Sequence, residues 1–502
     1  MTSVVNGDAL RLEFVTPEFD MPEGVLNTCL IDTPQAQEAR VIDHKRRAVQ
    51  AFARANRMDK RVLGQAGAKI GFVAAGKNWL DLAHAMQVLG MDQEAAVRHG
   101  VTTYKVAMTW PLDMQSFAEW AEGLDCIVVV EEKRKLIEGQ IKEALFNQKG
   151  ICRVFGSKDA QGALLFADSY ALDPMVIAQQ LGQILIAEGC GSARITGALE
   201  RIDAAQTANN APTLASRVPY FCSGCPHSSS TKIPEGSRAY SGIGCHYMVQ
   251  WMDRETLGFT QMGGEGANWI GESLFSTRAH VFQNIGDGTY NHSGIQAIRA
   301  ALAAGTTMTY KILFNDAVAM TGGQNNDGGL DAARIVQEMR GIGVKHLAVV
   351  YDEKEDISAA DFPAGTPMHP RAQLNTVQEA FRQLPGVSVI VYVQTCAAEK
   401  RRRRKRGAFP DPDQRLFINP DVCEGCGDCG VQSNCVSLLP LETPLGRKRQ
   451  IDQSSCNKDF SCVNGFCPSF ATVRGGQLRR PAAQQLSIPE LPAPPPCTLQ
   501  GT

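Results

Sequence analysis

The cysteines between residues 417 and 473 stand at spacings that suit metal chemistry. Cys423, Cys426 and Cys429 follow one another at two-residue intervals, and Cys467 precedes a proline further along. Short C-x2-C-x2-C runs completed by a remote Cys-Pro bind iron–sulfur clusters, because a tight loop brings three thiolates to one face of the cluster. We therefore expect these four cysteines to bind a [4Fe-4S] cluster. A pair of zinc ribbons, which also use C-x2-C spacing, is the alternative.

Three further cysteines of the same segment, Cys435, Cys456 and Cys462, are one thiolate short of a second four-cysteine set. The irons of a [4Fe-4S] cluster are usually held by four cysteine thiolates. We expect a second cluster here, with its fourth ligand unassigned.

The segment from residue 280 to residue 324 has the pattern of a diphosphate site. An apolar strand ends in Gly286, Asp287 and Gly288, a helix follows, and Asn315 comes after the next strand. The carboxyl ends of parallel strands meet at one edge of an open α/β sheet, where ligands of such domains bind. Asp287 and Asn315 can then share one Mg²⁺, which bridges protein oxygens to phosphates, while the glycines allow close backbone approach. A plain Asp-Gly turn is the alternative.

Length and composition limit the class of protein. A chain of 502 residues is long enough for about three domains, and a net charge of -2 gives no general attraction to nucleic acid or membrane. The N-terminus lacks a signal-peptide pattern, and no apolar stretch reaches the length of a membrane-spanning helix. We expect a cytoplasmic protein, whose 16 cysteines serve metal or redox chemistry rather than disulfides.

Alternating apolar strands and helices divide the chain into two α/β domains and a small cysteine-rich module. The pattern also predicts a helix over residues 33–56 and a polar connector over residues 204–218. The basic run RRRRKR predicts a solvated linker, with a nucleic-acid contact as the alternative. The predicted divisions are an irregular and helical N-terminal segment (1–68), the first α/β domain (69–203), the second α/β domain (219–398), the basic linker (399–414), the cysteine-rich module (415–475) and a proline-rich tail (476–502).

Several of these motifs resemble those of one enzyme family. The Gly-Asp-Gly turn with its downstream asparagine resembles the thiamine diphosphate motif, and the run FNDAVAMTGGQ is similar to its counterpart in 2-oxoacid:ferredoxin oxidoreductases. Over residues 30–475 the chain looks closest to the fused bacterial indolepyruvate ferredoxin oxidoreductases, and residues 69–147 resemble a transketolase C-terminal domain. The resemblance implies α/β, transketolase-like domains that bind thiamine diphosphate, plus a small α+β ferredoxin-like iron–sulfur module.

The resemblance also implies site residues. In that family a C-x2-C pair and two later cysteines bind the cluster nearest to thiamine, and the cysteines in those places are Cys222, Cys225, Cys245 and Cys396. The residues implied at the thiamine diphosphate and Mg²⁺ site are Gly286, Asp287, Gly288, Asn315, Ala317 and Thr321. The candidate catalytic residues, for each of which a structural role is the alternative, are His227, His246, Glu265 and His292.

The implied reaction is the oxidative decarboxylation of an aryl pyruvate to an acyl-coenzyme A, with electrons passing through two or three [4Fe-4S] clusters to ferredoxin. Phenylpyruvate, 4-hydroxyphenylpyruvate and aliphatic oxoacids all stay open as substrates. Two parts of the family pattern are not found in the sequence, namely the pyrimidine-binding domain with its activating glutamate and the gamma-type domain. We therefore expect a partner chain or a longer form of the protein to supply them, and an oligomer.

Two other classes of protein stay open. One is an electron-transfer subunit without catalysis of its own, which retention of thiamine diphosphate and Mg²⁺ would contradict. The other is a zinc-bearing structural or regulatory protein, which the brown colour of iron–sulfur clusters would contradict.

Overall fold

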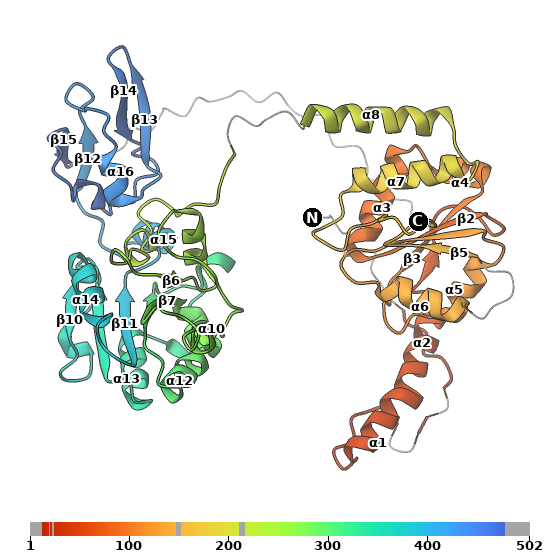
Figure 1. The fold of residues 1–502 in the computed structure, drawn as a ribbon, viewed down its shortest axis with the longest axis horizontal. Coiled ribbons are helices and arrows are strands. Elements are labelled where there is room, and N and C mark those ends of the chain that lie inside the picture. The colour runs from red at the N-terminus through yellow and green to blue at the C-terminus, as the bar shows by residue number, and fades with distance from the viewer. Residues whose placement is uncertain (1–12, 20, 23–24, 147–151, 210–215, 477–502) are drawn as a thin grey trace. The chain divides into compact units, whose positions relative to one another are not determined.

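The computed structural model describes residues 13–19, 21–22, 25–146, 152–209 and 216–476, which fall into two compact units, Met1–Leu214 and Ala215–Thr502 (Figure 1). The predicted tail lies outside the described residues from position 477 on, as do residues 210–215 of the predicted connector. Within the described ranges, no helix is both long and apolar enough to cross a bilayer.

The first unit combines a helical arm with a five-stranded sheet. The helix predicted over residues 33–56 is confirmed, although a π-helical turn interrupts it: the arm comprises α1 (Pro34–Ala39), η2 (Arg40–Lys45) and α2 (Arg46–Ala55). The sheet has the order β1-β3-β2-β4-β5, with only β1 antiparallel to its neighbour. Its strands are β1 (Lys60–Arg61), β2 (Ile70–Ala75), β3 (Val101–Val106), β4 (Cys126–Val130) and β5 (Arg153–Phe155). The helices are α3 (Gly76–Val88), α4 (Gln93–His99), α5 (Met114–Ala121), α6 (Leu136–Leu145), α7 (Pro174–Ala187) and α8 (Ala193–Asn209).

Two cores sandwich this sheet because successive strand side chains point to opposite faces. From β2, Phe72 packs into the core that α3 and α7 cover, whereas Val73 packs into the core that α5 and α6 cover. From β4, Val128 and Val129 divide between the two cores in the same way. Apolar residues on both faces are typical of parallel strands buried between helices.

The second unit is built on a six-stranded, fully parallel sheet in the order β10-β9-β11-β8-β7-β6. Its strands are β6 (Ala239–Tyr240), β7 (Val281–Gly286), β8 (Met308–Phe314), β9 (His346–Tyr351), β10 (Met368–Pro370) and β11 (Val387–Val393). The longer helices are α10 (Ala267–Glu272), α12 (Ile295–Ala303), α13 (Ala332–Gly341), α14 (Leu374–Phe381) and α15 (Ala397–Lys405). The short helical turns are α9 (His227–Ser230), η3 (Cys245–Trp251), α11 (Asp287–Thr289), η4 (Tyr290–Gly294), η5 (Ala319–Thr321), η6 (Asp327–Gly329), η7 (Ala359–Asp361) and η8 (Arg371–Gln373).

One face of this sheet packs against α10, α12 and α13, and α14 packs against the opposite face beside β9 and β11. Along β8, Tyr310 and Ile312 enter the first of these cores, so Lys311 points to the other face. There its Nζ meets the backbone of Ser230 and Lys232. The segment that contains these two residues therefore lies over the second face.

The cysteine-rich segment forms a small module of two antiparallel strand pairs. Its elements are β12 (Gln414–Ile418), α16 (Asp428–Ser433), β13 (Leu438–Thr443), β14 (Gly446–Ile451), η9 (Ser461–Val463) and β15 (Phe470–Arg474). β12 pairs with β15, and β13 pairs with β14. The module core contains Ile418, Cys423 and Cys429, so thiols take the place of much of the apolar volume that a segment of this length would otherwise bury.

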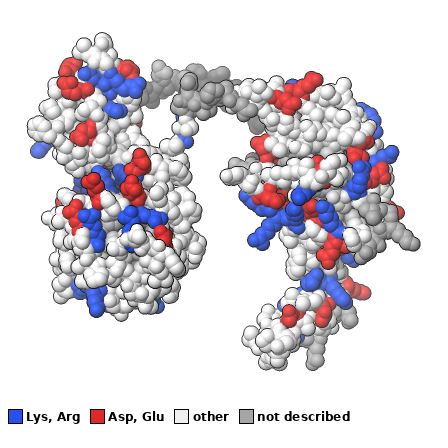
Figure 2. Space-filling view, viewed as in Figure 1, with Lys and Arg blue, Asp and Glu red and all other residues white. Residues whose placement is uncertain are grey.

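Two segments predicted as connectors are helical in part. Residues 204–209 belong to α8, and most of the basic run lies in α15. Lys400 and Arg404 of α15 are held by ion pairs, and Lys400 is buried, so these basic residues are neutralised by carboxylates instead of being left in solvent. On the face drawn in Figure 2, blue and red side chains are interspersed in both units, without one large surface of a single sign.

Candidate functional site

The carboxyl ends of β7, β8 and β11 meet at one edge of the six-stranded sheet. Gly286 at the end of β7 pairs in register with Leu313 of β8, and Val393 at the end of β11 pairs with Phe314. Asp287, Asn315 and Cys396 follow these three strands within a few residues, and the backbone N–H of Cys396 donates to the carbonyl of Asn315 over 2.9 Å. Parallel pairing has thus brought together residues that lie more than 100 positions apart.

Asp287 is the centre of this edge and is 2% exposed. Its Oδ1 accepts from the backbone N–H of Gly288 at 2.8 Å, and its Oδ2 accepts from the backbone N–H groups of Asn315 at 3.1 Å and Asp316 at 2.9 Å. Burial raises the pKa of this carboxyl, and the hydrogen bonds oppose the rise. The carboxylate therefore links the turn after β7 to the turn after β8 by hydrogen bonds.

Two amide oxygens beside this carboxylate have no protein donor. Asn326 Nδ2 donates to Asp287 Oδ2 at 3.1 Å, and both Asn326 Oδ1 and Asn315 Oδ1 are buried without a hydrogen-bond partner within the described residues. Buried oxygens of this kind need a hydrogen-bond donor or a cation. The donor set of one carboxylate and two amides fits a hard cation such as Mg²⁺.

Asn326 is a residue that the sequence analysis missed. It lies in the stretch Gln-Asn-Asn-Asp-Gly-Gly, which reads as an ordinary polar loop. No motif spacing links it to Asp287, and only the folded chain brings the two side chains together. Its burial in a glycine-rich loop is the one unusual property, and burial is not visible in the sequence.

The loop after β8 holds its shape by its own hydrogen bonds. The Thr321 hydroxyl donates to Gln324 Oε1 at 2.8 Å, and the backbone N–H of Val318 donates to the Gln324 carbonyl at 2.8 Å. Ala317 is buried directly after the Asn315 turn, whereas Thr321 is exposed. Of these two predicted cofactor residues, only Ala317 lies within the buried part of the edge.

Two predicted histidines form a buried pair. The rings of His227 and His246 are 5.4 Å apart between centroids, and each residue is 2% exposed. Burial lowers the pKa of His227 to about 4, and burial followed by the neighbouring charges holds the pKa of His246 well below its ordinary value. Both rings are therefore neutral at physiological pH.

His246 borders the Gly-Asp-Gly turn. A Cβ added to Gly286 would lie 3.3 Å from His246 Cε1, and one added to Gly242 would lie 2.7 Å from its Nε2. That Nε2 is buried and has no partner within the described residues. The glycines thus leave room for a neutral ring with one free nitrogen beside the edge of the sheet.

Glu265 and His292 differ in their surroundings. Glu265 is fully buried, and its Oε2 accepts from the backbone N–H of Gly263 at 2.7 Å, while burial raises its pKa. His292 is exposed, and its Nδ1 lies 2.9 Å from the Ser293 hydroxyl. Glu265 therefore organises the glycine-rich loop, and His292 does not join the buried residues.

The four cysteines implied near thiamine influence one another electrostatically. Burial raises the pKa of Cys225, and repulsion from Cys222, Cys245 and Cys396 raises it further, as expected for thiols in one region of the fold. The pKa of Cys245 rises for the same reasons, to about 11. The backbone N–H of His227 donates to the Cys225 sulfur and favours the thiolate.

The module cysteines form two groups. The first, comprising Cys423, Cys426, Cys429 and Cys467, lines a cavity of about 230 Å³. The second, comprising Cys435, Cys456 and Cys462, lines a smaller cavity of about 30 Å³ with Ser223 and Gly224. Burial raises the pKa of Cys462, and repulsion from Cys456 and Cys435 adds to it. Cys462 also packs against the core that contains Cys423 and Cys429, so the two groups adjoin.

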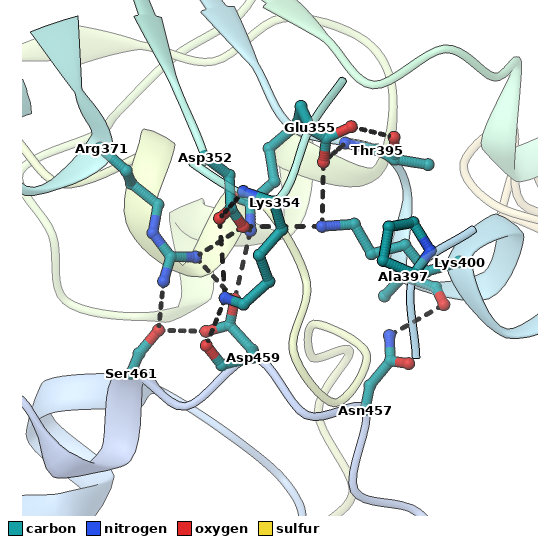
Figure 3. A network of polar contacts seen from close by, with 12 residues as sticks. Asp352, Lys354, Glu355, Arg371, Thr395, Ala397, Lys400, Asn457, Asp459 and Ser461 are labelled. Atoms are coloured by element: carbon teal, nitrogen blue, oxygen red, sulfur yellow. Dashed lines mark hydrogen bonds and ion pairs between the residues drawn. The ribbon is translucent and has the colours of Figure 1, made fainter. Parts of the chain in front are cut away.

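A buried polar network joins the module to the sheet (Figure 3). Arg371 Nη1 lies 2.6 Å from Asp459 Oδ1 and 3.5 Å from Asp352 Oδ2, and Lys354 Nζ donates to the Asp459 carbonyl at 3.0 Å. Asn457 Nδ2 donates to the carbonyl of Ala397, the residue after Cys396, at 2.9 Å. The module is therefore fixed against the edge of the sheet that holds Asp287 and Cys396.

Removing Arg371 is expected to loosen this junction. Arg371→Met leaves the carboxylate of Asp459 buried without its cation, which destabilises proteins by about 3 kcal/mol. We expect urea unfolding to show that loss, and the chain around Pro410 to become sensitive to limited proteolysis. Arg340→Met removes an exposed arginine of the same unit and serves as the control. Equal stability and proteolysis of the two variants would contradict the prediction.

Lys311 is fully buried on β8. Its Nζ donates to the carbonyls of Ser230 at 2.6 Å and Lys232 at 3.3 Å. Burial lowers the pKa of Lys311 to about 7, and the charge of Arg254 lowers it further. The folded protein therefore releases this proton at a far lower pH than the unfolded chain does.

We expect this difference to appear as pH-dependent stability. The unfolded chain keeps the proton up to a pKa of about 10.4, so the free energy of unfolding rises with pH above about 7, by up to about 1.4 kcal/mol per pH unit. Lys311→Met removes this contribution, whereas the exposed control Lys345→Met keeps it. Urea unfolding at about pH 7.5 and 9.5 measures the slope. Identical slopes in the wild type and Lys311→Met would show that Lys311 is not the group responsible.

Comparisons with known proteins agree with this architecture. Residues 60–209 match the model of the indolepyruvate oxidoreductase domain, and residues 242–361 match the model of the C-terminal TPP-binding domain of thiamine pyrophosphate enzymes. The indolepyruvate oxidoreductase subunit IorA of Thermococcus kodakarensis is 24% identical, over 82% of this chain and 62% of its own length. The IorA subunit of Pyrococcus abyssi is 25% identical, over 83% and 62%.

The fold, the Asp287 edge and these matches define a thiamine diphosphate-type α/β enzyme chain. These matches support a relationship to the 2-oxoacid:ferredoxin oxidoreductase superfamily. It spans 62% of the length of the two archaeal relatives. A solved 2-oxoglutarate:ferredoxin oxidoreductase from Magnetococcus marinus is 18% identical over 36% of this chain and 66% of its own, at a TM-score of 0.28 on which no argument rests.

Proposed function

We propose that this chain is a subunit of an aryl pyruvate oxidoreductase of the indolepyruvate type, which binds thiamine diphosphate and passes electrons to ferredoxin. The observation that carries the proposal is the hydrogen bond between Cys396 and Asn315. It joins one of four neighbouring thiols to the strand end beside Asp287. A redox group and a cofactor anchor are thus built on the same edge of one sheet.

When bound, thiamine diphosphate supplies the decarboxylation chemistry of a 2-oxoacid, iron–sulfur clusters supply one-electron transfer, and coenzyme A accepts the acyl group. Asp287, Asn315 and Asn326 would hold the Mg²⁺ of the diphosphate through their side-chain oxygens. The glycines at 286 and 288 leave the backbone free to approach phosphate. Ala317 and Thr321 shape the loop beside it.

His246 would orient substrate or cofactor by a hydrogen bond from its buried Nε2. Because burial keeps the ring neutral, it acts as a hydrogen-bonding group and not as a cation. His227 packs against it and holds the ring in place. Glu265 keeps the facing loop folded, and His292, which is exposed, is a candidate for contact with a partner domain.

The cysteine groups would hold iron–sulfur clusters. Within the described residues, no group of three or more His, Cys, Asp or Glu side chains is suited to a single metal ion. A cluster differs from one ion in that its thiolates bind separate irons and so stand farther apart. Neighbouring thiols lining a cavity, as Cys423, Cys426, Cys429 and Cys467 do, suit that arrangement.

The proposal assigns a role to each part of the chain. Residues 69–203 would form the transketolase C-terminal-like domain, residues 219–398 the thiamine diphosphate domain, and residues 415–475 the ferredoxin-like module. A pyrimidine-binding domain with its activating glutamate and a gamma-type domain would come from another chain or from further sequence, within an oligomer in the cytoplasm. The assembled domains together would determine which 2-oxoacid binds.

The test is the iron, acid-labile sulfide and zinc content of protein purified without oxygen. Two or three clusters correspond to about eight to twelve irons with a similar amount of sulfide per chain. About two to three zincs without sulfide would contradict the proposal and favour a structural protein. Retention of thiamine diphosphate with Mg²⁺ separates the catalytic subunit from a purely electron-transferring one.

A further inference from the structure

The first three positions of the two cysteine runs of the module have the same spacing with one exchange, and the fourth cysteine follows six positions later in the first run and five in the second. In the first run the cysteines occupy positions 423, 426 and 429, and a further cysteine stands at 435. In the second run the corresponding positions are 456, 459 and 462, followed by 467, and position 459 is an aspartate. Asp459 thus stands where a C-x2-C-x2-C run has its middle cysteine.

The structure pairs these runs crosswise. Cys467, the last cysteine of the second run, lines one cavity with Cys423, Cys426 and Cys429, whereas Cys435, the last cysteine of the first run, lines another with Cys456 and Cys462. The fourth cysteine of each run therefore joins the other group, as it does in two-cluster ferredoxins. The second group is left with three thiols and with Asp459 as the residue in the fourth position.

Asp459 borders the same small cavity as Cys435, Cys456 and Cys462, but both oxygens of its carboxylate are hydrogen-bonded to other groups. Its Oδ1 accepts from Arg371 Nη1 at 2.6 Å and from Gln394 Nε2 at 3.2 Å, and its Oδ2 accepts from the Ser461 hydroxyl. Figure 3 shows this side chain among the residues of the sheet edge, facing Arg371. Oδ1 therefore docks the module against the edge of the sheet, and Oδ2 is hydrogen-bonded within the module.

The loop from Cys222 to Cys225 lies close to Asp459. A Cβ added to Gly224, between Cys222 and Cys225, would lie 3.1 Å from the Asp459 Cβ. The nearby hydroxyls are also engaged: Ser223 and Ser437 are hydrogen-bonded to each other, and Ser437 lies 2.9 Å from Ser455. The loop from Cys222 to Cys225 thus packs directly on the segment between Cys456 and Cys462.

We infer that Cys435, Cys456 and Cys462 hold a three-iron [3Fe-4S] cluster and that Asp459 is a docking residue instead of a fourth ligand. A fourth iron at this site would have no thiolate, and the carboxylate that could replace it is bound to Arg371. This inference rests on the proposed function. It departs from the four-iron cluster that the family pattern implies for this site.

The three-iron site would be the middle of an electron relay. On one side, the hydroxyl of Ser223, which lies between Cys222 and Cys225, is 3.3 Å from the Cys435 sulfur. On the other side, Cys462 packs against the core that contains Cys423 and Cys429 of the remaining group. The order would be the Cys222 group, then the Cys435 group, then the Cys423 group.

The test is electron paramagnetic resonance of the full chain, oxidised with thionine under argon. An oxidised three-iron cluster has an odd number of electrons and gives a signal, whereas oxidised [4Fe-4S]²⁺ clusters are silent. We expect about one spin per chain, with about eleven irons and twelve sulfides for two four-iron clusters and one three-iron cluster. The signal is expected to persist after dithionite reduction, incubation with Fe²⁺ and reoxidation. The reduced cluster could instead take up one iron, so that [3Fe-4S]⁰ and Fe²⁺ become [4Fe-4S]²⁺. Loss of the resonance signal with uptake of one iron would overturn the inference.

Two substitutions locate the fourth position. Asp459→Asn keeps a hydrogen-bond acceptor for Arg371 but removes the carboxylate, and the signal is expected to stay. Asp459→Cys offers a thiolate, so about one iron should be gained and the signal lost. If the oxidised wild type gave no resonance signal and Asp459→Asn gave one, Asp459 would be a cluster ligand and the inference would be overturned. A protein without iron and sulfide would instead remove the proposed function itself.

Discussion

Asp287→Ala is expected to weaken Mg²⁺-dependent binding of thiamine diphosphate by about 100-fold. The buried carboxylate is the one negative charge in a donor set completed by the amide oxygens of Asn315 and Asn326. Removing one charged partner costs about 3 kcal/mol, which corresponds to about a 100-fold change in affinity. Isothermal titration with thiamine diphosphate at fixed Mg²⁺ measures the effect.

The same substitution also frees the backbone N–H groups that Asp287 accepts from, at Gly288, Asn315 and Asp316. A loss of stability is therefore expected in addition, and Asp287→Asn, which keeps an acceptor but loses the charge, separates the two effects. Asp356→Ala removes an exposed carboxylate of the same unit and should bind as the wild type does. Unchanged binding in both Asp287 variants would refute the cation assignment.

Cys222→Ser is expected to abolish the four-iron cluster of its group, with a loss of about one to four irons per chain, while leaving the module's iron in place. Cys222 is exposed, so a serine at this position disturbs little packing, yet it removes one of four neighbouring thiols. The remaining three cannot complete a four-iron cluster. Iron and sulfide analysis, together with the visible absorbance of the clusters, measures the loss.

The control for this experiment is Cys152→Ser, which changes a cysteine of the first unit outside all three groups. It should keep the wild-type iron content. Thiamine diphosphate binding by Cys222→Ser should also persist, because the Asp287 donor set does not include a thiol. A Cys222→Ser protein with the full iron content would show that this ligand set is wrong.

Both experiments probe one edge of the second unit, where three independent features meet. The Asp287 carboxylate clasps the ends of β7 and β8, Cys396 is bonded to Asn315, and Asn457 of the module is bonded to Ala397. The polar network around Arg371 and Asp459 then fixes the module against this edge. The arrangement links the cofactor anchor to Cys396 and to the module segment that carries Cys456.

The sequence by itself determined the local elements and the types of chemistry. Alternation of apolar residues predicted β2, β4 and β8, and helical periodicity predicted the arm over residues 33–56, all of which the structure confirms. These signals are local, because a strand or helix shows its buried face within a few residues. The motif spacings pointed to a 2-oxoacid oxidoreductase, and the matches to two family models agree.

Only the tertiary structure decided what depends on contacts between distant segments. Asn326 joins Asp287 across 39 positions, and Asp459, which follows the spacing of a ligand, turns instead to Arg371, 88 positions earlier. The basic run forms α15 because carboxylates of the sheet edge neutralise buried Lys400. Such choices depend on the net free energy of burial, hydrogen bonding and charge pairing in the folded chain, and no local pattern records that balance.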